Sequence, residues 1–190
     1  MFFEGTDRVH RAMRTVAAVF EENKIAYAIV GGMAVNAHRY VRTTGDVDFL
    51  VRAESLSIIR QLAAAGVFDA APGRSRRFVE PATGIHFDVL VTGMFPGSGR
   101  AGPIAFPDPA SVGQVLSDLR VINLPSLIEL KLAARRHKDF ADVVDLIRSN
   151  GLDESFMAQL HESVHGDFIE CLEEKRREDE YERRQDEGPV

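Results

Sequence analysis

Hydrophobic positions along this chain follow two different periods, and the changes of period delimit its predicted elements. The first segment, residues 7–23, has apolar side chains every three or four positions, which predicts an amphipathic helix. Either Thr6 or Asp7 is expected to cap its start. The positions expected to face the core are Val9, Met13, Val16, Ala17 and Phe20.

The stretch from residue 27 to residue 51 is the centre of the pattern. Successive side chains of a strand point to opposite faces. Asp46 and Asp48 are therefore expected on one face of a strand, with Val47 and Phe49 on the other. The predicted order is strand 27–30, the glycine pair Gly31-Gly32, helix 33–40, a basic and hydroxyl-bearing turn over 42–45, and strand 46–51.

The rest of the chain alternates between extended and helical patterns. Strand 85–91 is predicted to pair with strand 78–80 through a turn at 81–84, with Asp88 on the face opposite to Phe87. A loop over 92–109, rich in Gly and Pro, is long enough to cover a site. The other predicted elements are helix 52–66, helix 109–119, strand 121–124, helix 126–136 capped by Ser126, helix 139–149, and a helix from 154 to about 172.

Composition narrows the class of protein. The 190 residues suffice for one domain with an appendage, and a net charge of −6 argues against a surface coated in positive charge for duplex binding. The single cysteine, Cys171, suits a reducing compartment. Residues 1–5 lack a signal-peptide pattern and no apolar run approaches a membrane span, so we expect a soluble cytoplasmic protein. Residues 173–187 are almost wholly charged and predict a solvated helix end or a frayed tail.

Carboxylates in the central stretch are the strongest chemical signal. Aspartate is unfavourable in strands, so the presence of Asp46 and Asp48 in an otherwise apolar strand calls for an explanation. A solvent-facing edge strand is one reason, but Asp88, in a second apolar strand, supplies a third carboxylate. Mg²⁺ prefers such hard oxygen ligands and completes its octahedron with water and substrate phosphate. We predict that these three residues hold Mg²⁺, with Mn²⁺ as the alternative ion, and that Asp88 is also a candidate base.

A glycine pair follows the first strand of this stretch. At the start of a helix, the backbone N–H groups of Gly31 and Gly32 are candidates to hold phosphate oxygens. A tight turn alone would also explain both glycines. The chain contains neither GxGxxG nor GxxxxGK[ST].

Basic residues gather between positions 131 and 138. Lys131, Arg135 and Lys138 fall on neighbouring faces of one helix, and Arg136 joins them, which suits the charge of a triphosphate. The alternative is a solvated helix face with internal ion pairs to the nearby aspartates, Asp139 and Asp142. Arg42 and His38 are further candidates, although a lone histidine is more often structural.

In combination these motifs resemble the DNA polymerase beta-type nucleotidyltransferase superfamily. The shared pattern is an apolar strand, a glycine pair, Asp-x-Asp and a later apolar-flanked aspartate. Its AbiEii-type branch contains nucleotidyltransferase toxins of bacterial toxin–antitoxin systems. The details that resemble this branch are Gly31-Gly32-x-Ala34-x-x-x-His38, Arg42-x-Thr44-x-Asp46-Val47-Asp48, and Lys131-x-x-Ala134-x-Arg136-x-Lys138-Asp139-x-x-Asp142. One departure is Gly32, where many members carry a serine whose hydroxyl contacts phosphate.

The resemblance implies an α+β (mixed α/β) fold, in which a mixed sheet is flanked by helices and followed by a C-terminal helical segment. A catalytic core is implied over residues 1–112, and a strand and helices that complete the nucleotide site over 113–150. Residues 151–190 would form a terminal helix and tail. The implied catalytic residues are Asp46, Asp48, Asp88 and Lys131. The implied nucleotide-binding residues are Gly31, Gly32, Arg42, Thr44, Lys131, Arg136, Lys138 and Asp139.

The implied reaction is the Mg²⁺-dependent transfer of a nucleoside monophosphate from an NTP, such as ATP, to a hydroxyl of an RNA, a protein or a small molecule. Transfer RNA is one such acceptor, and a cognate antitoxin is an implied partner. Two alternatives stay open. The fold could serve as a noncatalytic module that binds a nucleotide or a partner protein, which the missing serine favours. His161 to His165 also match HExxH, a zinc-hydrolase motif, in a poor context because Gly166 adjoins the second histidine.

Overall fold

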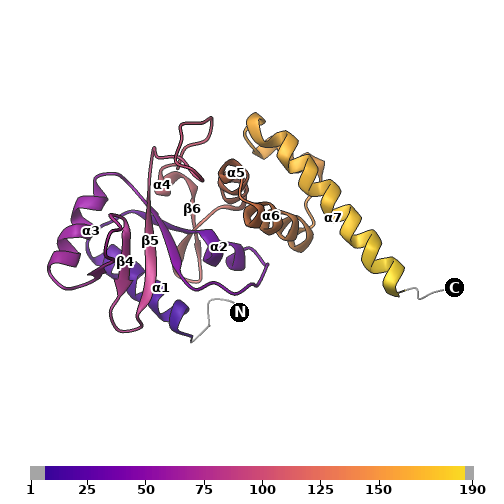
Figure 1. Cartoon of the computed structure of the whole chain (residues 1–190). Helices are drawn as coiled ribbons and strands as arrows, with labels where there is room; N and C mark the ends of the chain where they lie inside the picture. The colour runs from indigo at the N-terminus through magenta and orange to yellow at the C-terminus, as the bar shows by residue number, and fades with distance from the viewer. Residues whose placement is uncertain (1–6, 187–190) are drawn as a thin grey trace.

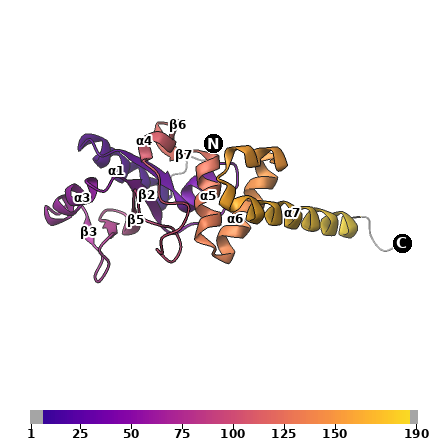
Figure 2. The same cartoon turned by 90° about the horizontal axis from the view of Figure 1, so that it is seen from above.

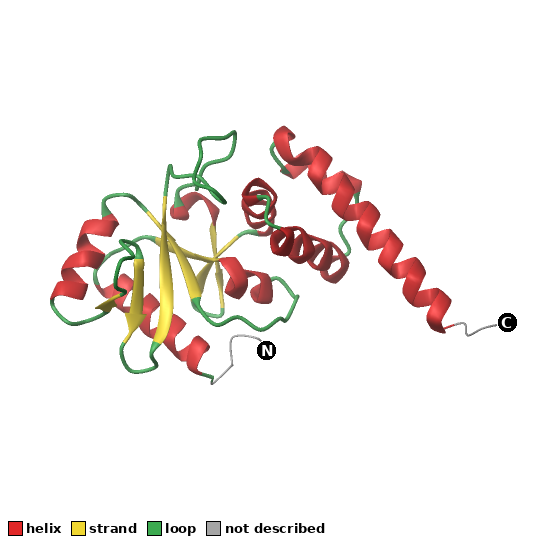
Figure 3. Cartoon of the chain, in the orientation of Figure 1, coloured by secondary structure: helices red, strands yellow, loops and turns green. Residues whose placement is uncertain are grey.

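A computed structural model describes residues 7–186 of the chain, so the predicted cap Thr6 lies outside the described residues. Its centre is a seven-stranded sheet in the order β3-β4-β5-β2-β1-β7-β6 (Figures 1 and 3). The strands are β1 (Tyr27–Val30), β2 (Val47–Val51), β3 (Asp69–Ala70), β4 (Arg77–Glu80), β5 (Ile85–Val91), β6 (Gly113–Leu116) and β7 (Leu119–Ile122). The α-helices are α1 (Arg8–Glu22), α2 (Gly31–Ala37), α3 (Ser55–Ala64), α4 (Pro109–Val112), α5 (Leu124–Ala134), α6 (His137–Asn150) and α7 (His165–Asp186).

The sheet is mixed. β2 runs parallel to β5 and β1 runs parallel to β7, whereas the other neighbouring strands are antiparallel. Helices flank it, and a helical segment follows it at the C-terminal end (Figure 3). The α+β (mixed α/β) fold expected from the sequence is confirmed.

An aromatic core covers one face of the sheet under helix α1. The Phe20 ring of α1 meets the Phe49 ring of β2 edge-on, with centroids 5.2 Å apart, and the Phe87 ring of β5 lies 6.3 Å from Phe20. All three side chains are at most 1% exposed. Because side chains alternate along a strand, the burial of Phe49 on this face turns Asp48 to the opposite face.

Helices α5, α6 and α7 lead away from the sheet in both views (Figures 1 and 2). α5 contacts α2, α6 packs on α5, and α7 packs on α6. Phe168, Cys171 and Leu172 are buried in this packing, whereas no residue from 173 to 185 is buried. The charged C-terminal part of α7 extends beyond the rest of the protein. No helix within residues 7–186 combines the length and apolar character needed to cross a membrane.

The prediction of a helix over 109–119 is wrong. Only Pro109–Val112 is helical, and the chain then enters β6, which pairs antiparallel with β7. Ser117 and Asp118 have φ angles of 48° and 67° and form the two-residue turn between these strands. The apolar residues fall at helical spacing, but pairing along the edge of the sheet outweighs this local pattern.

Several predicted boundaries also need correction. β2 begins at Val47, so Asp46 lies just before the strand and not within it. The glycine pair is part of α2, and the strand predicted at 121–124 is displaced to Leu119–Ile122. Asn123, not Ser126, caps α5, because its side-chain oxygen accepts a hydrogen bond from the Ser126 N–H at 2.9 Å.

The C-terminal segment differs most from its predicted form. In place of a helix from residue 154, two 3-10 turns (Glu154–Gln159 and Glu162–Val164) precede α7. α7 then continues through the charged segment as far as Asp186. The charged residues are therefore a solvated helix end, which was one of the two predicted states.

Candidate active site

A row of charged side chains crosses three neighbouring strands on the face opposite to the aromatic core. Asp48 of β2 and Asp88 of β5 are direct partners across the parallel ladder, and Arg77 of β4 is the direct partner of Asp88. Asp46, just before β2, reaches the same row, because its Oδ2 lies 3.4 Å from the Arg77 guanidinium. The predicted meeting of three carboxylates is therefore organised around an arginine.

Gly31 begins α2 directly against this row. Its φ is +62°, and a Cβ added there would lie 1.9 Å from Oδ2 of Asp48. Gly32 is confined in a similar way, because a Cβ there would lie 2.7 Å from the Thr44 hydroxyl oxygen. Close approach to Asp48 and Thr44 thus explains why both positions are glycine.

The carboxylates of the row repel one another. Burial, and then the charges of Asp46 and Asp88, raise the pKa of Asp48 to about 6. Burial also raises the pKa of Asp88, against the opposing effect of Arg77. Within residues 7–186 no cationic side chain forms an ion pair with Asp48. The row therefore sets three carboxylates against one paired guanidinium.

The sequence-based prediction missed Arg77, although the hairpin contains the signal for it. The turn at 81–84 pairs Glu80 with Ile85. Three residues farther from the turn on each strand, Arg77 lies opposite Asp88. The turn itself is fixed by Glu80, which is only 3% exposed. Its carboxylate accepts hydrogen bonds from the backbone N–H of Ala82 at 3.0 Å and of Thr83 at 2.9 Å.

Asp48, Asp88 and Arg77 lie at the floor of a cleft of about 530 Å³ between the sheet and helix α5, whereas Asp46 is not among its lining residues. Gly31, Asp48 and Asp88 are among its lining residues, with Arg74, Arg76 and Arg77 on the β3–β4 side. The loop predicted to cover a site does line the cleft, through Met94 to Gly99 and Phe106. Close packing holds the loop there, because a Cβ on Gly97 would lie 2.5 Å from the carbonyl oxygen of Ala134 at the end of α5.

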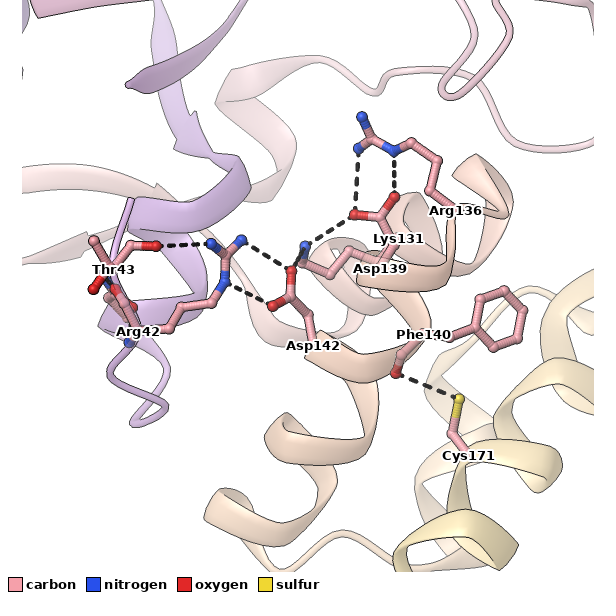
Figure 4. A network of polar contacts seen from close by, with 9 residues as sticks. Arg42, Thr43, Lys131, Arg136, Asp139, Phe140, Asp142 and Cys171 are labelled. Atoms are coloured by element: carbon pink, nitrogen blue, oxygen red, sulfur yellow. Dashed lines mark hydrogen bonds and ion pairs between the residues drawn. The ribbon is translucent and has the colours of Figure 1, made fainter. Parts of the chain in front are cut away.

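A second charged group lies where α5 ends and α6 begins (Figure 4). Lys131 of α5 is 5% exposed, and its Nζ lies 2.5 Å from Asp142 and 3.3 Å from Asp139. Arg136 pairs with Asp139 at 2.5 Å, and Arg42 pairs with Asp142 at 2.7 Å. The network therefore ties the loop before β2 to the two helices.

This geometry corrects the predicted basic helix face. α5 ends at Ala134 and Arg135 is left-handed, with a φ of 54°, so residues 131–138 span two helices. The alternative of ion pairs to the two aspartates is confirmed, but Lys131 is buried and not solvated. Its charge still reaches the carboxylate row, because Lys131 and Lys138 both act to lower the pKa of Asp48.

The predicted nucleotide-binding residues divide into two groups. Gly31, Lys131, Arg136 and Asp139 line the cleft. Gly32, Arg42, Thr44 and Lys138 do not line it. Arg42 and Thr44 lie behind Gly32, where they pack against the start of α2.

The histidines singled out by the sequence have structural roles. Nε2 of His38 lies 2.7 Å from the carbonyl oxygen of Ile122, and burial lowers the pKa of this side chain. His161 precedes a 3-10 turn and its Nδ1 contacts the Ser163 hydroxyl, whereas His165 begins α7 and contacts the Leu160 carbonyl. The HExxH segment is therefore not one helix, and the two histidines do not share a helical face.

The donor chemistry at the carboxylate row suits Mg²⁺. Three carboxylates offer only hard oxygen ligands, and the Arg77 guanidinium already stands as a cation between two of them. As the side chains lie, no three His, Cys, Asp or Glu residues within 7–186 are placed to hold one ion. An ion at the row would therefore compete with the charge of Arg77 for these carboxylates.

Comparison with known proteins supports the fold. No protein-family model and no curated protein matches the sequence. The solution structure of the antibiotic-resistance factor ANT(2'')-Ia aligns over 92% of this chain and 96% of that chain, with a TM-score of 0.52 and 11% identity. A crystal structure of ANT(2'')-Ia in complex with adenylyl-2''-tobramycin aligns over 74% and 88%, with a TM-score of 0.50 and 13% identity. At such identity the likeness shows a shared fold, and function has to be argued from the site.

Proposed function

We propose that this chain is a metal-dependent nucleotidyltransferase, which moves a nucleoside monophosphate from an NTP to an acceptor hydroxyl. The observation that carries the proposal is the pair Asp48 and Asp88, two carboxylates directly opposite each other on parallel strands at the floor of a cleft. The shared fold supports it, because the protein of that fold was solved with an adenylyl-bearing molecule.

In this proposal Asp46, Asp48 and Asp88 hold Mg²⁺ or Mn²⁺. Such an ion neutralises phosphate charge and stabilises the attacking and leaving oxygens of the displacement. Asp88 accepts the proton of the acceptor hydroxyl, a role that suits a carboxylate whose pKa is raised by burial.

The cations at the α5–α6 junction position the nucleotide in this proposal. Lys131 and Arg136 line the cleft and face the phosphates, and Asp139 holds both side chains in place. Lys138 adds positive charge at the same end. Gly31 lets the backbone approach the phosphates beside Asp48.

A layer behind the cleft supports these residues. Asp142 holds Arg42, and the Thr44 hydroxyl fills the space next to Gly32 where a serine side chain would project. The Thr44 hydroxyl thus stands close to the position of the hydroxyl that Gly32 lacks.

The acceptor is proposed to be an RNA, a protein or a small molecule with a free hydroxyl. The motifs that resemble the AbiEii-type branch favour a transfer RNA acceptor and a toxin with a cognate antitoxin. The single cysteine suits a cytoplasmic location. A fold shared with an antibiotic-resistance factor favours a small-molecule acceptor.

The proposal is tested by incubating the protein with Mg²⁺, each α-labelled NTP, and pools of RNA, protein and small metabolites. We expect label on one class of acceptor, and a loss of at least about a thousandfold in rate for Asp48→Asn. Asp118→Asn is the matched control, because Asp118 is an exposed turn residue far along the chain from the row and asparagine tolerates its positive φ. Equal rates for Asp48→Asn and the wild type would exclude the mechanism.

The second candidate is a noncatalytic module that binds a nucleotide. The close packing of Gly32 against Thr44 favours it, because a Cβ at residue 32 would lie 2.7 Å from the Thr44 hydroxyl oxygen and the position therefore suits glycine, not serine. Tight binding of an NTP with Mg²⁺, without label transfer to any acceptor pool, would identify this function.

A further inference from the structure

One arginine occupies the space between two of the three carboxylates. Nη1 of Arg77 lies 2.9 Å from Oδ2 of Asp88, and Nη2 lies 3.4 Å from Oδ2 of Asp46. The hairpin register imposes this position, because Arg77 and Asp88 are direct cross-strand partners. A guanidinium suits the role because its separate N–H donors can span two acceptors. One oxygen of each of these two carboxylates is thus already held by a cation.

This arrangement differs from a preformed metal site. Asp46 and Asp88 face Arg77, whereas Asp48 takes part in no ion pair among the described residues. Each carboxylate keeps its Oδ1, but a divalent ion bound to Asp46 and Asp88 would lie close to the positive guanidinium between them, which opposes its binding. Metal binding and the ion pairs of Arg77 therefore oppose each other.

An anion in the cleft would offer Arg77 an alternative partner. Its side chain lines the cleft together with those of Arg74 and Arg76, and neither of these forms an ion pair with a carboxylate within residues 7–186. A guanidinium released among these like charges is unfavourable unless it meets negative charge. Phosphate oxygens offer that charge in a geometry that a guanidinium binds well.

We propose that Arg77 is a positioning residue that makes metal binding and nucleotide binding depend on each other. Without a nucleotide, Arg77 competes with the metal ion for Asp46 and Asp88, and the ion alone binds weakly. A triphosphate draws the guanidinium away, and the freed carboxylates take the ion. By linkage, each ligand strengthens the binding of the other by the same factor. The part of the inference that concerns the triphosphate rests on the proposed function.

The first measurement is the affinity for Mn²⁺ alone, from the electron paramagnetic resonance signal of the free ion. Arg77→Met keeps the apolar stem of a partly exposed side chain and removes the competing charge. We expect it to bind Mn²⁺ about tenfold more tightly than the wild type. Arg184→Met removes the same charge from the exposed end of α7 and should leave the affinity unchanged. Arg77→Lys, which keeps the charge on a single donor, should show a smaller gain.

The second measurement is the affinity for the Mn²⁺ complexes of the α,β-methylene analogues of ATP, GTP, CTP and UTP. We expect Arg77→Met to bind the preferred complex about tenfold more weakly than the wild type does. The two changes have opposite signs, which a purely structural role for Arg77 would not produce. Unchanged or weaker binding of Mn²⁺ alone by Arg77→Met would overturn the inference. If the wild type binds none of the analogues, the proposed function is wrong. The result with Mn²⁺ alone still tests whether Arg77 competes with the metal ion for Asp46 and Asp88.

Discussion

Gly31 and Asp48 are packed so closely that each limits what the other position can hold. A side chain at Gly31 would meet the Asp48 carboxylate and would also sit on a left-handed backbone. The left-handed conformation alone costs a residue with a Cβ about 1–2 kcal/mol. The collision adds to this cost, because the atom encountered belongs to a short side chain held by the sheet.

Gly31→Ala should therefore lower the free energy of unfolding by about 3 kcal/mol or more, measured by urea denaturation. Gly66→Ala is the matched control, because Gly66 has a φ of +80° with no atom within 4 Å of the added Cβ. It should cost only the backbone strain of about 1 kcal/mol. Equal losses in the two variants would show that the contact with Asp48 is not tight.

Asp48 itself should destabilise the metal-free protein at neutral pH. Its pKa is raised from 3.8 to about 6, first by burial and then by Asp46 and Asp88. Between these values the folded state binds more protons than the unfolded chain, so this group's contribution to stability falls as the pH rises from 3.8 to 6. The full penalty, reached above pH 6, is about 3 kcal/mol at most.

Asp48→Asn should consequently be more stable than the wild type in urea denaturation at pH 7.5 without metal. The advantage should shrink towards pH 4, where the wild-type carboxyl is protonated. Asp118→Asn should give no difference at either pH. A variant less stable than the wild type at pH 7.5 would mean that the carboxylate is not repelled by its neighbours.

At the scale of elements, the junction of α5 and α6 depends on one buried cation. Lys131 stands between Asp139 and Asp142, which are 2% and 5% exposed. Asp139 also pairs with Arg136, and Asp142 also pairs with Arg42; both arginines are more exposed than the aspartates. Removing one member of such a buried group leaves uncompensated charge, which costs more than the intact group contributes.

Lys131→Met should lower the free energy of unfolding by about 3 kcal/mol, in a thermal or urea transition. Lys138→Met, on the exposed surface of the adjoining helix, should change it by less than about 0.5 kcal/mol. The comparison separates the buried charge from the general basic character of the segment. Similar small effects in both variants would show that the two aspartates do not depend on Lys131.

Elements with a strong local period could be predicted from the sequence. Helix α1 and strands β1, β2 and β5 all occur at their predicted places, within a few residues. The helix predicted at 109–119 is wrong because its apolar spacing fits a helix, whereas residues 113–116 form a strand that pairs with β7. The break between α5 and α6 was predicted two residues late, and residues 131–138 were treated as one helix face, because a left-handed Arg135 leaves no signal of the kind that a glycine gives.

At the scale of the whole molecule, the site depends on contacts between residues far apart in sequence. Asp48 and Asp88 meet because β2 and β5 pair in parallel across 40 positions of chain, a pairing that no local pattern states. The sequence could therefore supply the candidate ligands but not the cation among them. Arg77 is one of three arginines between residues 74 and 77, and only the hairpin register shows that it lies opposite Asp88.

The two halves of the last helix, α7, differ in how they contact the rest of the protein. Phe168, Cys171 and Leu172 pack α7 on α6, whereas Glu178 and Asp179 reach back only to the partly exposed Arg148. A chain that ends at Arg176 should therefore lose no more than about 1 kcal/mol in unfolding free energy. Phe168→Ala should cost about 3–4 kcal/mol, because it opens a cavity in the packing. A large loss from the truncation would mean that the charged end of α7 contributes to stability.

The short turn over 81–84 governs the cleft without lining it. Side chains along a strand repeat every two residues, so a turn longer or shorter by a single residue would reverse both faces of β4 if pairing is kept. Arg77 would then point into the aromatic layer, and Phe78 or Arg76 would stand across from Asp88. The length of this turn thus selects which side chain meets Asp88. A change of two residues keeps Arg77 on the carboxylate face but moves it two positions along β5 from Asp88.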